Sequence, residues 1–245
     1  MIKCIICNSK TFLVKNVDLK YTILKCDICK VEFVNPMPSK KDLDSFYSNY
    51  SDLRASDNNV LEKNSKRIYN KIKLKYGLTK SSNLLDFGSG KNSFVTGNLP
   101  NNFKSYDPYT FNNDKNLLTK NTYDYITFLG VLEHLTEIKK TICHLMSLLK
   151  KNGILIITTV DINQVIPFRY KPPEHTIYFT HAAVIELFKG FKILEYSPYF
   201  MVQNSDIYLE ILHRSMPNKY KKLIYNNLPQ IVEIPTNEVF IVIKK

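Results

Sequence analysis

Four cysteines near the start of the chain constrain its fold more than any other feature. They form two Cys-x-x-Cys pairs with 18 residues between them, Cys4 with Cys7 and Cys26 with Cys29. Each pair can present two thiolates from one tight turn, and two such turns complete the tetrahedral shell of a structural zinc ion. We therefore predict a zinc ribbon over residues 1–38. Two alternatives stay open: a redox-active pair, or a metal site that has decayed.

The bulk composition limits the class of protein. The chain has 245 residues, of which 44% are hydrophobic, enough for one large domain or for a core with an appendage. No run of 18 apolar residues occurs, and the first residues lack the apolar region of a secretory signal. We therefore expect no membrane span and a cytoplasmic location, where paired cysteines stay reduced and available for metal.

The formal net charge of +12 raises the question of nucleic-acid binding. Only four of the 34 basic residues are arginine, which is the better bidentate ligand for phosphate, and the lysines are scattered. The charge therefore favours a solvated lysine surface over a nucleic-acid interface, and attraction of an anionic substrate stays open.

From residue 83 onwards, strand patterns alternate with helix patterns. We expect strands at 83–87, 103–107, 123–129, 154–160, 191–196 and 238–245, and helices at 61–77, 134–150 and 182–189, the last of them capped by Thr180. Such alternation predicts an α/β fold with a mostly parallel sheet and helices on both faces. Residues 39–78 form an expected helical linker or lid, opened by a Ser39–Asp42 capping box, and residues 79–245 the core. Residues 200–235 are the least readable part, with a helical stretch at 220–226.

A glycine turn follows the first core strand. Gly88 and Gly90 come directly after Asp86, and glycine lets a backbone turn sharply and approach a cofactor at the carboxyl end of a strand. Asp107 ends the next strand, where a carboxylate can accept hydrogen bonds from ribose hydroxyls. The third glycine of a dinucleotide fingerprint is replaced by Ser93, which disfavours a dehydrogenase. The alternative is a simple strand-to-helix turn.

The joint series of motifs resembles a class I S-adenosylmethionine-dependent methyltransferase. The segments that carry the likeness are Asp86-x-Gly88-x-Gly90, Tyr106-Asp107-Pro108, Asp124-x-Ile126 and Val131-Leu132-Glu133-His134-Leu135. The order of the chain is also similar to one subgroup, in which a zinc ribbon ends in Phe-x-Asn-Pro-x-Pro and Tyr-x-x-Tyr follows; here these are 33–38 and 47–50. Bacterial members of that subgroup commonly modify sugars or surface polysaccharides.

The resemblance implies a set of cofactor-binding residues. S-adenosylmethionine would be held by Asp86, Gly88, Gly90, Asp107, Leu129 and Glu133, with Tyr47 and Tyr50 as a cover. Two departures from the family pattern stand out. Asn92 replaces a third glycine, and only 16 residues separate Asp107 from Asp124, so that a helix and a strand usual in this fold are shortened or missing.

A third motif supplies the candidate catalytic residues. Pro172-Pro173 precedes Glu174 and His175, and a similar segment in ribbon-bearing sugar C-methyltransferases supplies a base. An imidazole has a suitable pKa to remove a proton from an acceptor, and Glu174 would orient or balance it. The alternative is that His175 only packs its loop. His134 is the competing candidate: it contacts substrate, or it begins the helix over 134–150.

Taken together, these patterns predict methyl transfer from S-adenosylmethionine to a small-molecule acceptor, such as a nucleotide-linked sugar or a precursor of a capsule or surface polysaccharide. The ribbon would help to build the acceptor site. Two rivals remain: an RNA methyltransferase that uses the ribbon and the basic surface, and a non-catalytic module that binds a partner.

Overall fold

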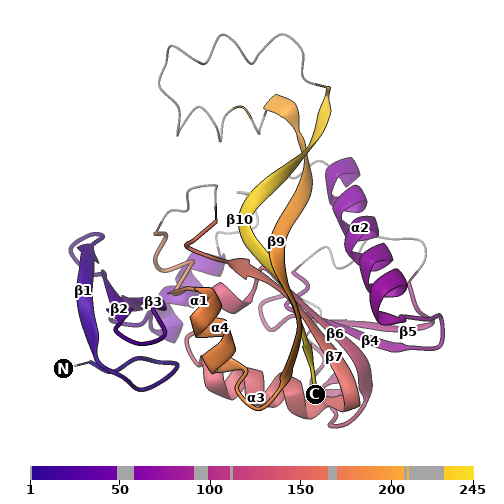
Figure 1. Cartoon of the computed structure of the whole chain (residues 1–245), viewed down its shortest axis with the longest axis horizontal. Coiled ribbons are helices and arrows are strands. Elements are labelled where there is room, and N and C mark those ends of the chain that lie inside the picture. The colour runs from indigo at the N-terminus through magenta and orange to yellow at the C-terminus, as the bar shows by residue number, and fades with distance from the viewer. Residues whose placement is uncertain are drawn as a thin grey trace.

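The computed structural model of the chain describes residues 2–48, 58–90, 99–110, 113–164, 170–206, 209 and 229–245. Two β-sheets organise it, a small one that carries the cysteines and a larger one in the core (Figure 1). Within the described residues, no helix combines the length and the apolar character that a membrane crossing requires.

The small sheet has four antiparallel strands in the order β1-β2-β3-β8. Its first three strands are β1 (Thr11–Asn16), β2 (Thr22–Cys26) and β3 (Glu32–Asn35), and with the two cysteine pairs they form what we call the cysteine module. The fourth strand, β8 (Ile177–Tyr178), comes from far along the chain. The module therefore does not end its own sheet, since a segment of the predicted core completes it.

The larger sheet has six strands in the order β5-β4-β6-β7-β10-β9. They are β4 (Asn83–Phe87), β5 (Asn102–Tyr106), β6 (Tyr123–Leu129), β7 (Leu149–Val160), β9 (Lys192–Asn204) and β10 (Ile231–Lys244). The first four strands of this order run parallel, whereas β10 runs antiparallel to both β7 and β9. The predicted mostly parallel sheet is thus a mixed one, and β9 and β10 extend beyond it as a long two-stranded arm (Figure 1).

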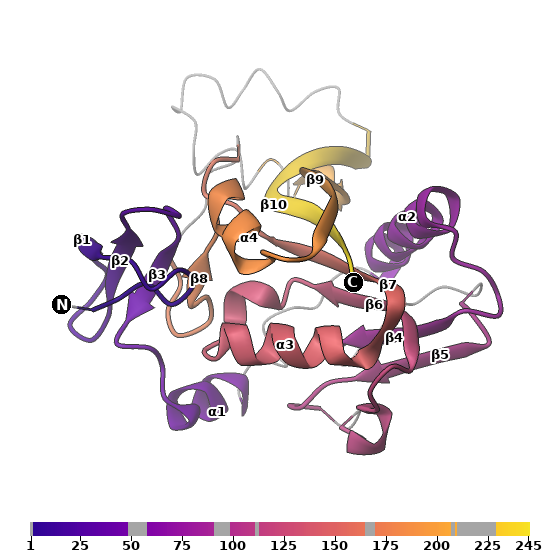
Figure 2. The same ribbon diagram turned by 60° about the horizontal axis from the view of Figure 1, so that its bottom comes forward.

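Helices cover both faces of the larger sheet, as predicted. The helix α2 (Asn58–Tyr76) lies on one face, and α3 (Ile138–Leu148) and α4 (His181–Leu187) lie on the other (Figure 2). Neighbouring residues of β4 show the alternation that this requires, because Leu84 belongs to the buried cluster of α2 and Leu85 to that of α3. Burial on both faces explains why the strands read as continuous apolar runs.

Short-range signals placed two helix starts correctly. At the start of α1 (Lys40–Ser48), the Ser39 and Asp42 side chains each accept a hydrogen bond from the other's backbone N–H, as a capping box requires. The Thr180 hydroxyl accepts from the backbone N–H of Ala183 at the start of α4.

The helix predicted from residue 134 instead begins at Ile138, and His134 lies in a short 3₁₀ helix, Leu132–His134. The reason is a competing donor: Thr176 donates its backbone N–H to the carbonyl of Glu133 and its hydroxyl to the carbonyl of Leu135, at 2.7 and 2.6 Å. Those carbonyls are therefore satisfied from outside, and the α-helical ladder starts later.

The connection between β5 and β6 is short, as the spacing from Asp107 to Asp124 predicted. In its described residues it forms one 3₁₀ turn, Lys115–Leu117. The helical stretch predicted at 220–226 lies outside the described residues.

Candidate functional site

The glycine turn after β4 is tied to the end of β5. Gly88 donates its backbone N–H to the carbonyl of Tyr106, at 2.8 Å. The two carboxylate oxygens of Asp107 accept from the backbone N–H groups of Gly90 and Tyr109, both at 2.8 Å. Asp107 is buried, so these two bonds balance part of the cost of desolvating its charge. The structure therefore brings the predicted turn and the predicted ribose carboxylate into direct contact.

The two glycines of this turn face different surroundings. Both have left-handed backbones, with φ of +79° at Gly88 and +60° at Gly90. A Cβ atom at Gly88 would lie 2.5 Å from Cγ2 of Val131, whereas one at Gly90 would meet no described atom within 4 Å. Close packing explains the first glycine, and the second borders space beside Asp107 that none of the described residues fills. That combination fits a nucleoside approaching the turn.

Asp86, two residues before the glycine turn, connects β4 to the neighbouring strand. Its Oδ1 atom accepts a hydrogen bond of 2.8 Å from the hydroxyl of Thr127, which joins β4 to β6, and both residues are buried. Leu129, at the end of β6, packs against the buried cluster of α2. Their cofactor-binding roles stay predictions.

The second part of the site begins with Glu133 and His134. Glu133 is only 2% exposed, and its Oε2 atom accepts a hydrogen bond of 2.8 Å from the hydroxyl of Thr159 on β7. Its Oε1 atom lies 4.0 Å from Nε2 of His134. The Nδ1 atom of His134 lies 2.8 Å from the carbonyl oxygen of Glu174. Because a carbonyl oxygen only accepts, Nδ1 donates the proton there, and Nε2 is the nitrogen that faces Glu133.

His175 packs against this histidine. The two rings lie edge to face, with their centroids 4.8 Å apart. His175 is 7% exposed, and its Nε2 atom lies 3.9 Å from Oε1 of Glu174. The loop that carries it is anchored by Tyr178, whose hydroxyl donates to the carbonyl of His175 and accepts from the N–H of Lys171. Burial raises the pKa of Tyr178, so its hydroxyl keeps the proton that it donates.

Tyr47 connects the two parts of the site. From α1, its hydroxyl oxygen lies 3.1 Å from Nδ1 of His134, and its ring stacks on that of Tyr109 with centroids 4.8 Å apart. Tyr109 follows Asp107 by two residues. One side chain of the predicted lid therefore contacts both His134, a candidate catalytic residue, and Tyr109, which lies beside the predicted cofactor-binding Asp107. Tyr50, the second predicted lid residue, lies outside the described residues.

Sequence reasoning missed four of these residues. Tyr109, Thr127, Thr159 and Thr176 each make a contact on which the geometry of the site depends. Tyr109 carried a signal, since it directly follows the motif Tyr106-Asp107-Pro108. The three threonines sit in or beside β-prone runs, where threonine is common for reasons of packing alone.

The four cysteines come together as their spacing predicted. Sγ atoms of Cys4 and Cys29 are 3.6 Å apart, and those of Cys7 and Cys26 are 3.3 Å apart. Ligands around a tetrahedral zinc with bonds of about 2.3 Å lie about 3.8 Å from one another, so the sulfurs stand close to the geometry of a bound ion. The hydrogen bond between the two sulfurs lowers the pKa of Cys4 and raises that of Cys29, so Cys4 is the thiolate of this pair in the absence of metal.

The two cysteine turns are built alike. Backbone N–H groups of Ile6 and Ile28 point at the sulfurs of Cys4 and Cys26, at 3.4 and 3.3 Å. The residue after each pair, Asn8 or Lys30, has a left-handed backbone with φ near +60°. This donor set suits a thiophilic ion such as zinc, and N–H groups aimed at the sulfurs stabilise the thiolate form.

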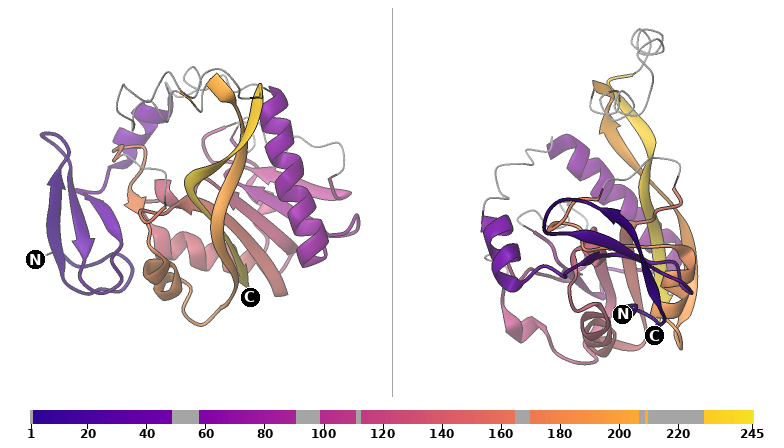
Figure 3. Two further views of the ribbon diagram at one scale, coloured as in Figure 1. Left: turned by 45° about the horizontal axis from the view of Figure 1, so that its top comes forward. Right: turned by 90° about the vertical axis from the view of Figure 1, so that its left-hand side faces the viewer.

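The cysteine module is joined directly to the histidine loop. Strand β3 pairs with β8, two residues after His175, and Val34 donates its backbone N–H to the carbonyl of Thr176. The hydroxyl of Thr180 donates to the carbonyl of Cys29 at 2.8 Å. Figure 3 shows the module beside this segment, away from α2. The segment that follows His175 is therefore connected to the module by a strand pair and by two further hydrogen bonds.

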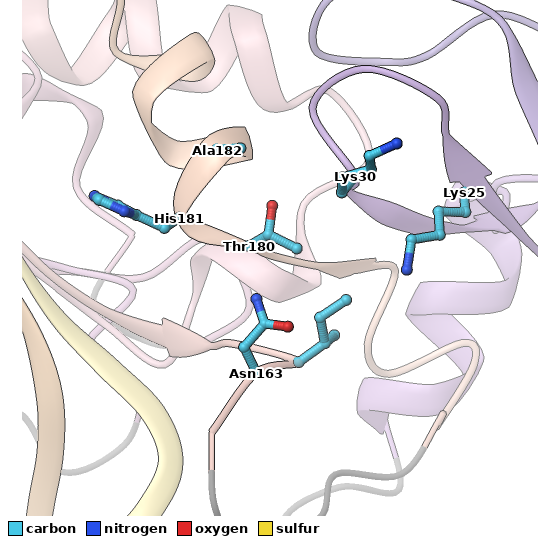
Figure 4. A pocket seen from close by; sticks show the side chains of 7 residues that line it. Lys25, Lys30, Asn163, Thr180, His181 and Ala182 are labelled. Carbon is cyan, nitrogen blue, oxygen red and sulfur yellow. The ribbon is translucent and has the colours of Figure 1, made fainter.

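A groove of about 430 Å³ lies between the cysteine module and the core. Lys25 and Lys30 line it from the module, and Asn163, Thr180 and His181 from the core (Figure 4). None of the predicted cofactor-binding or catalytic residues lines it. Its lysines are engaged within the module, Lys25 with Glu32 and Lys30 with the carbonyl of Asp27.

Comparisons with known proteins place the chain in a family. Residues 59–195, more than half of the chain, match the family described as "Methyltransferase domain". The structure resembles that of a Burkholderia thailandensis 1,6-didemethyltoxoflavin-N1-methyltransferase with bound 1,6-didemethyltoxoflavin and S-adenosylhomocysteine. That match has a TM-score of 0.53 and 14% identity, and it covers 94% of this chain and 98% of the other.

A Thermotoga maritima SAM-dependent methyltransferase, described as a possible histamine N-methyltransferase, gives a TM-score of 0.46 at 14% identity, with 84% of this chain and 99% of the other covered. Curated protein sequences give no match. The family match confirms the enzyme class expected from the motifs. The chain belongs to the methyltransferase-domain family and is an S-adenosylmethionine-dependent methyltransferase.

Proposed function

We propose that this enzyme methylates a small-molecule acceptor, a nucleotide-linked sugar or a precursor of a surface polysaccharide, with His175 as the base. One observation carries the proposal: Tyr47 contacts Tyr109 beside Asp107 and also His134. These contacts support a single site that includes the predicted cofactor turn and the paired histidines. The acceptor class rests on the resemblance of the ribbon-bearing motif series to sugar-modifying enzymes, and a cytoplasmic setting goes with it.

In this proposal the glycine turn and Asp107 hold the cofactor. Gly90 leaves room for a nucleoside, and the Asp107 carboxylate, fixed by two backbone N–H groups, has remaining lone pairs for ribose hydroxyls. S-adenosylmethionine supplies a methyl group activated on a sulfonium. The protein's tasks are to orient the acceptor in line with that methyl, to exclude water and to remove a proton.

The paired histidines handle the proton. His175 would take it from the acceptor, and the Glu174 carboxylate at 3.9 Å would balance the imidazolium that forms. His134 is held by the Glu174 carbonyl and faces the Glu133 carboxylate, so it is suited to orient the acceptor or to share the base role. Burial of Glu133 and His175 makes these electrostatic contacts stronger than they would be in water.

We also propose that the cysteine module is a zinc ribbon with a structural role. Four thiolates would fill the tetrahedral shell and leave no position for substrate. The module would act on catalysis through its position, because β3 braces the strand that follows His175.

The experiment is a screen of nucleotide sugars with S-adenosylmethionine, followed by three variants on the acceptor that reacts. His175→Ala is expected to lower turnover by about 10²–10⁴-fold while calorimetry still shows cofactor binding. His134→Ala tests the shared role, and His144→Ala, at an exposed position of α3, is the matched control and keeps full activity. Full turnover by His175→Ala would remove it from the proton transfer. Methylation of RNA instead of any sugar, with binding that weakens steeply with salt, would replace the proposed acceptor.

A further inference from the structure

A second group of side chains that carry potential metal ligands lies in the described part of the chain. Glu133, His134 and His175 each offer a ligand atom, and these atoms all lie within 4.8 Å of one another. We propose that this group binds a divalent transition metal ion, and that the bound ion blocks methyl transfer. The binding stands on geometry alone, whereas the block rests on the proposed function, because it requires that a histidine act as the base.

The ligand set is typical of transition metals. Two imidazoles and one carboxylate suit Zn²⁺, Co²⁺ or Ni²⁺, whereas Mg²⁺ and Ca²⁺ prefer oxygen ligands alone. Ligand atoms around a tetrahedral zinc with bonds of about 2.0–2.1 Å lie about 3.4 Å apart. Oε1 of Glu133 and Nε2 of His134 are 4.0 Å apart, so small side-chain movements of about half an ångström bring this pair to bonding geometry.

The surrounding hydrogen bonds match those of metal sites. A metal-bound histidine almost always donates its other ring N–H to a carbonyl or carboxylate, and Nδ1 of His134 is 2.8 Å from the Glu174 carbonyl. The second carboxylate oxygen of Glu133 accepts from the Thr159 hydroxyl, which turns Oε1 toward His134. These contacts orient two of the three ligands before any ion arrives.

Three protein ligands leave at least one coordination position open, in contrast to the four thiolates of the cysteine module. The ion at Glu133 is therefore expected to bind more weakly and to exchange faster than the ion at the cysteines. While it is bound, the imidazole lone pairs form metal–nitrogen bonds and cannot accept a proton. Transition-metal ions should thus inhibit the enzyme reversibly.

The binding test uses the full chain with zinc already at the cysteines and with no acceptor or cofactor present. Equilibrium dialysis against Co²⁺, followed by metal analysis, is expected to show one additional ion per chain in the wild type and in the control His144→Ala. His134→Ala and His175→Ala should lose that ion and keep the zinc. Thr159→Val retains all three ligands and removes the supporting hydroxyl, so its affinity for Co²⁺ should fall about 10–100-fold.

Two results would overturn the site: no additional ion in the wild type, or an additional ion that persists in both histidine variants. Thr159→Val decides the matter if the histidine variants fail to fold, because unchanged affinity there contradicts the geometry. Inhibition is measured separately, with turnover expected to fall as Co²⁺ rises and to recover with a weak chelator. Turnover that rises with Co²⁺ would contradict the proposed inhibition by the bound ion. Absence of turnover with every acceptor would count against the proposed function, and the dialysis result would still decide the site.

Discussion

Substitution of Gly88 by alanine tests the packing of the cofactor turn quantitatively. The new Cβ atom would lie 2.5 Å from Cγ2 and 3.0 Å from Cγ1 of Val131, a half-buried side chain. A left-handed backbone costs an alanine about 1–2 kcal/mol, and overpacking costs about 1–3 kcal/mol more. The sum is about 2–5 kcal/mol, which corresponds to a fall in melting temperature of about 4–20 °C for a chain of this size.

Three further variants separate the contributions. Gly190→Ala also has a positive φ, +95°, and no described atom lies within 4 Å of its Cβ position, so it should show the backbone cost alone. Adding Val131→Ala to Gly88→Ala removes both clashing methyl groups and should restore the overpacking share in a double-mutant cycle. Urea unfolding of the wild type, of the single variants Gly88→Ala, Val131→Ala and Gly190→Ala, and of the Gly88→Ala/Val131→Ala double variant gives the free energies. A Gly88→Ala loss no larger than that of Gly190→Ala, or no rescue by Val131→Ala, would refute the reasoning.

Three other predictions concern the cofactor, the metal and pH. Asp107→Ala should lower the affinity for S-adenosylmethionine about tenfold or more, as measured by calorimetry, because it leaves ribose hydroxyls and two backbone N–H groups unpaired; unchanged affinity would place the cofactor elsewhere. Metal analysis should find one zinc ion held by the cysteines. Removal of the zinc by a strong chelator should speed hydrogen exchange of the Val34 amide in β3 while cofactor binding remains. Equal exchange rates with and without zinc would contradict a structural role for the ion. Burial raises the pKa of Glu195, but hydrogen bonds from Lys71 and Lys75 outweigh burial and lower this pKa to about 2. The carboxylate therefore stabilises the fold above pH 4.5, and the stabilisation disappears as the pH falls toward 2. Glu195→Gln should make the free energy of unfolding less dependent on pH between 2 and 4.5, and an unchanged pH dependence would contradict this role of Glu195.

Local sequence patterns predicted those parts of the fold whose causes are local. The capping contacts of Ser39 and Thr180 join residues three positions apart, and strand periodicity depends on neighbours two positions apart. The predicted start of α3 was wrong because the contacts that delay the helix come from residues far along the chain. Thr176 donates hydrogen bonds to the carbonyls of Glu133 and Leu135 from about 40 residues away, and the hydrophobic periodicity near Leu135 cannot predict those contacts.

The same distinction holds for the site. Asp107 and Gly90 belong to motifs at the ends of adjacent parallel strands, and the topology alone brings them together. The contact of Tyr47 with His134 spans 87 residues and depends on where α1 lies. The sequence could name both residues, from the resemblance, but it could not show that one touches the other.

The cysteine module at the start of the chain is connected to the loop near residue 175 by strand pairing. Strand β8 has only two residues, too few to be stable alone, and it pairs with β3 of the module. The next residue, Phe179, bridges to Asp161 at the end of β7 in the larger sheet. The segment that carries His175 is therefore fixed between two sheets, and the cysteines order one of them. In the proposed function, a zinc ion that tightens the module would hold β3 in place and so limit the positions open to His175, which would make the proposed ribbon a support for the proposed proton-transfer site.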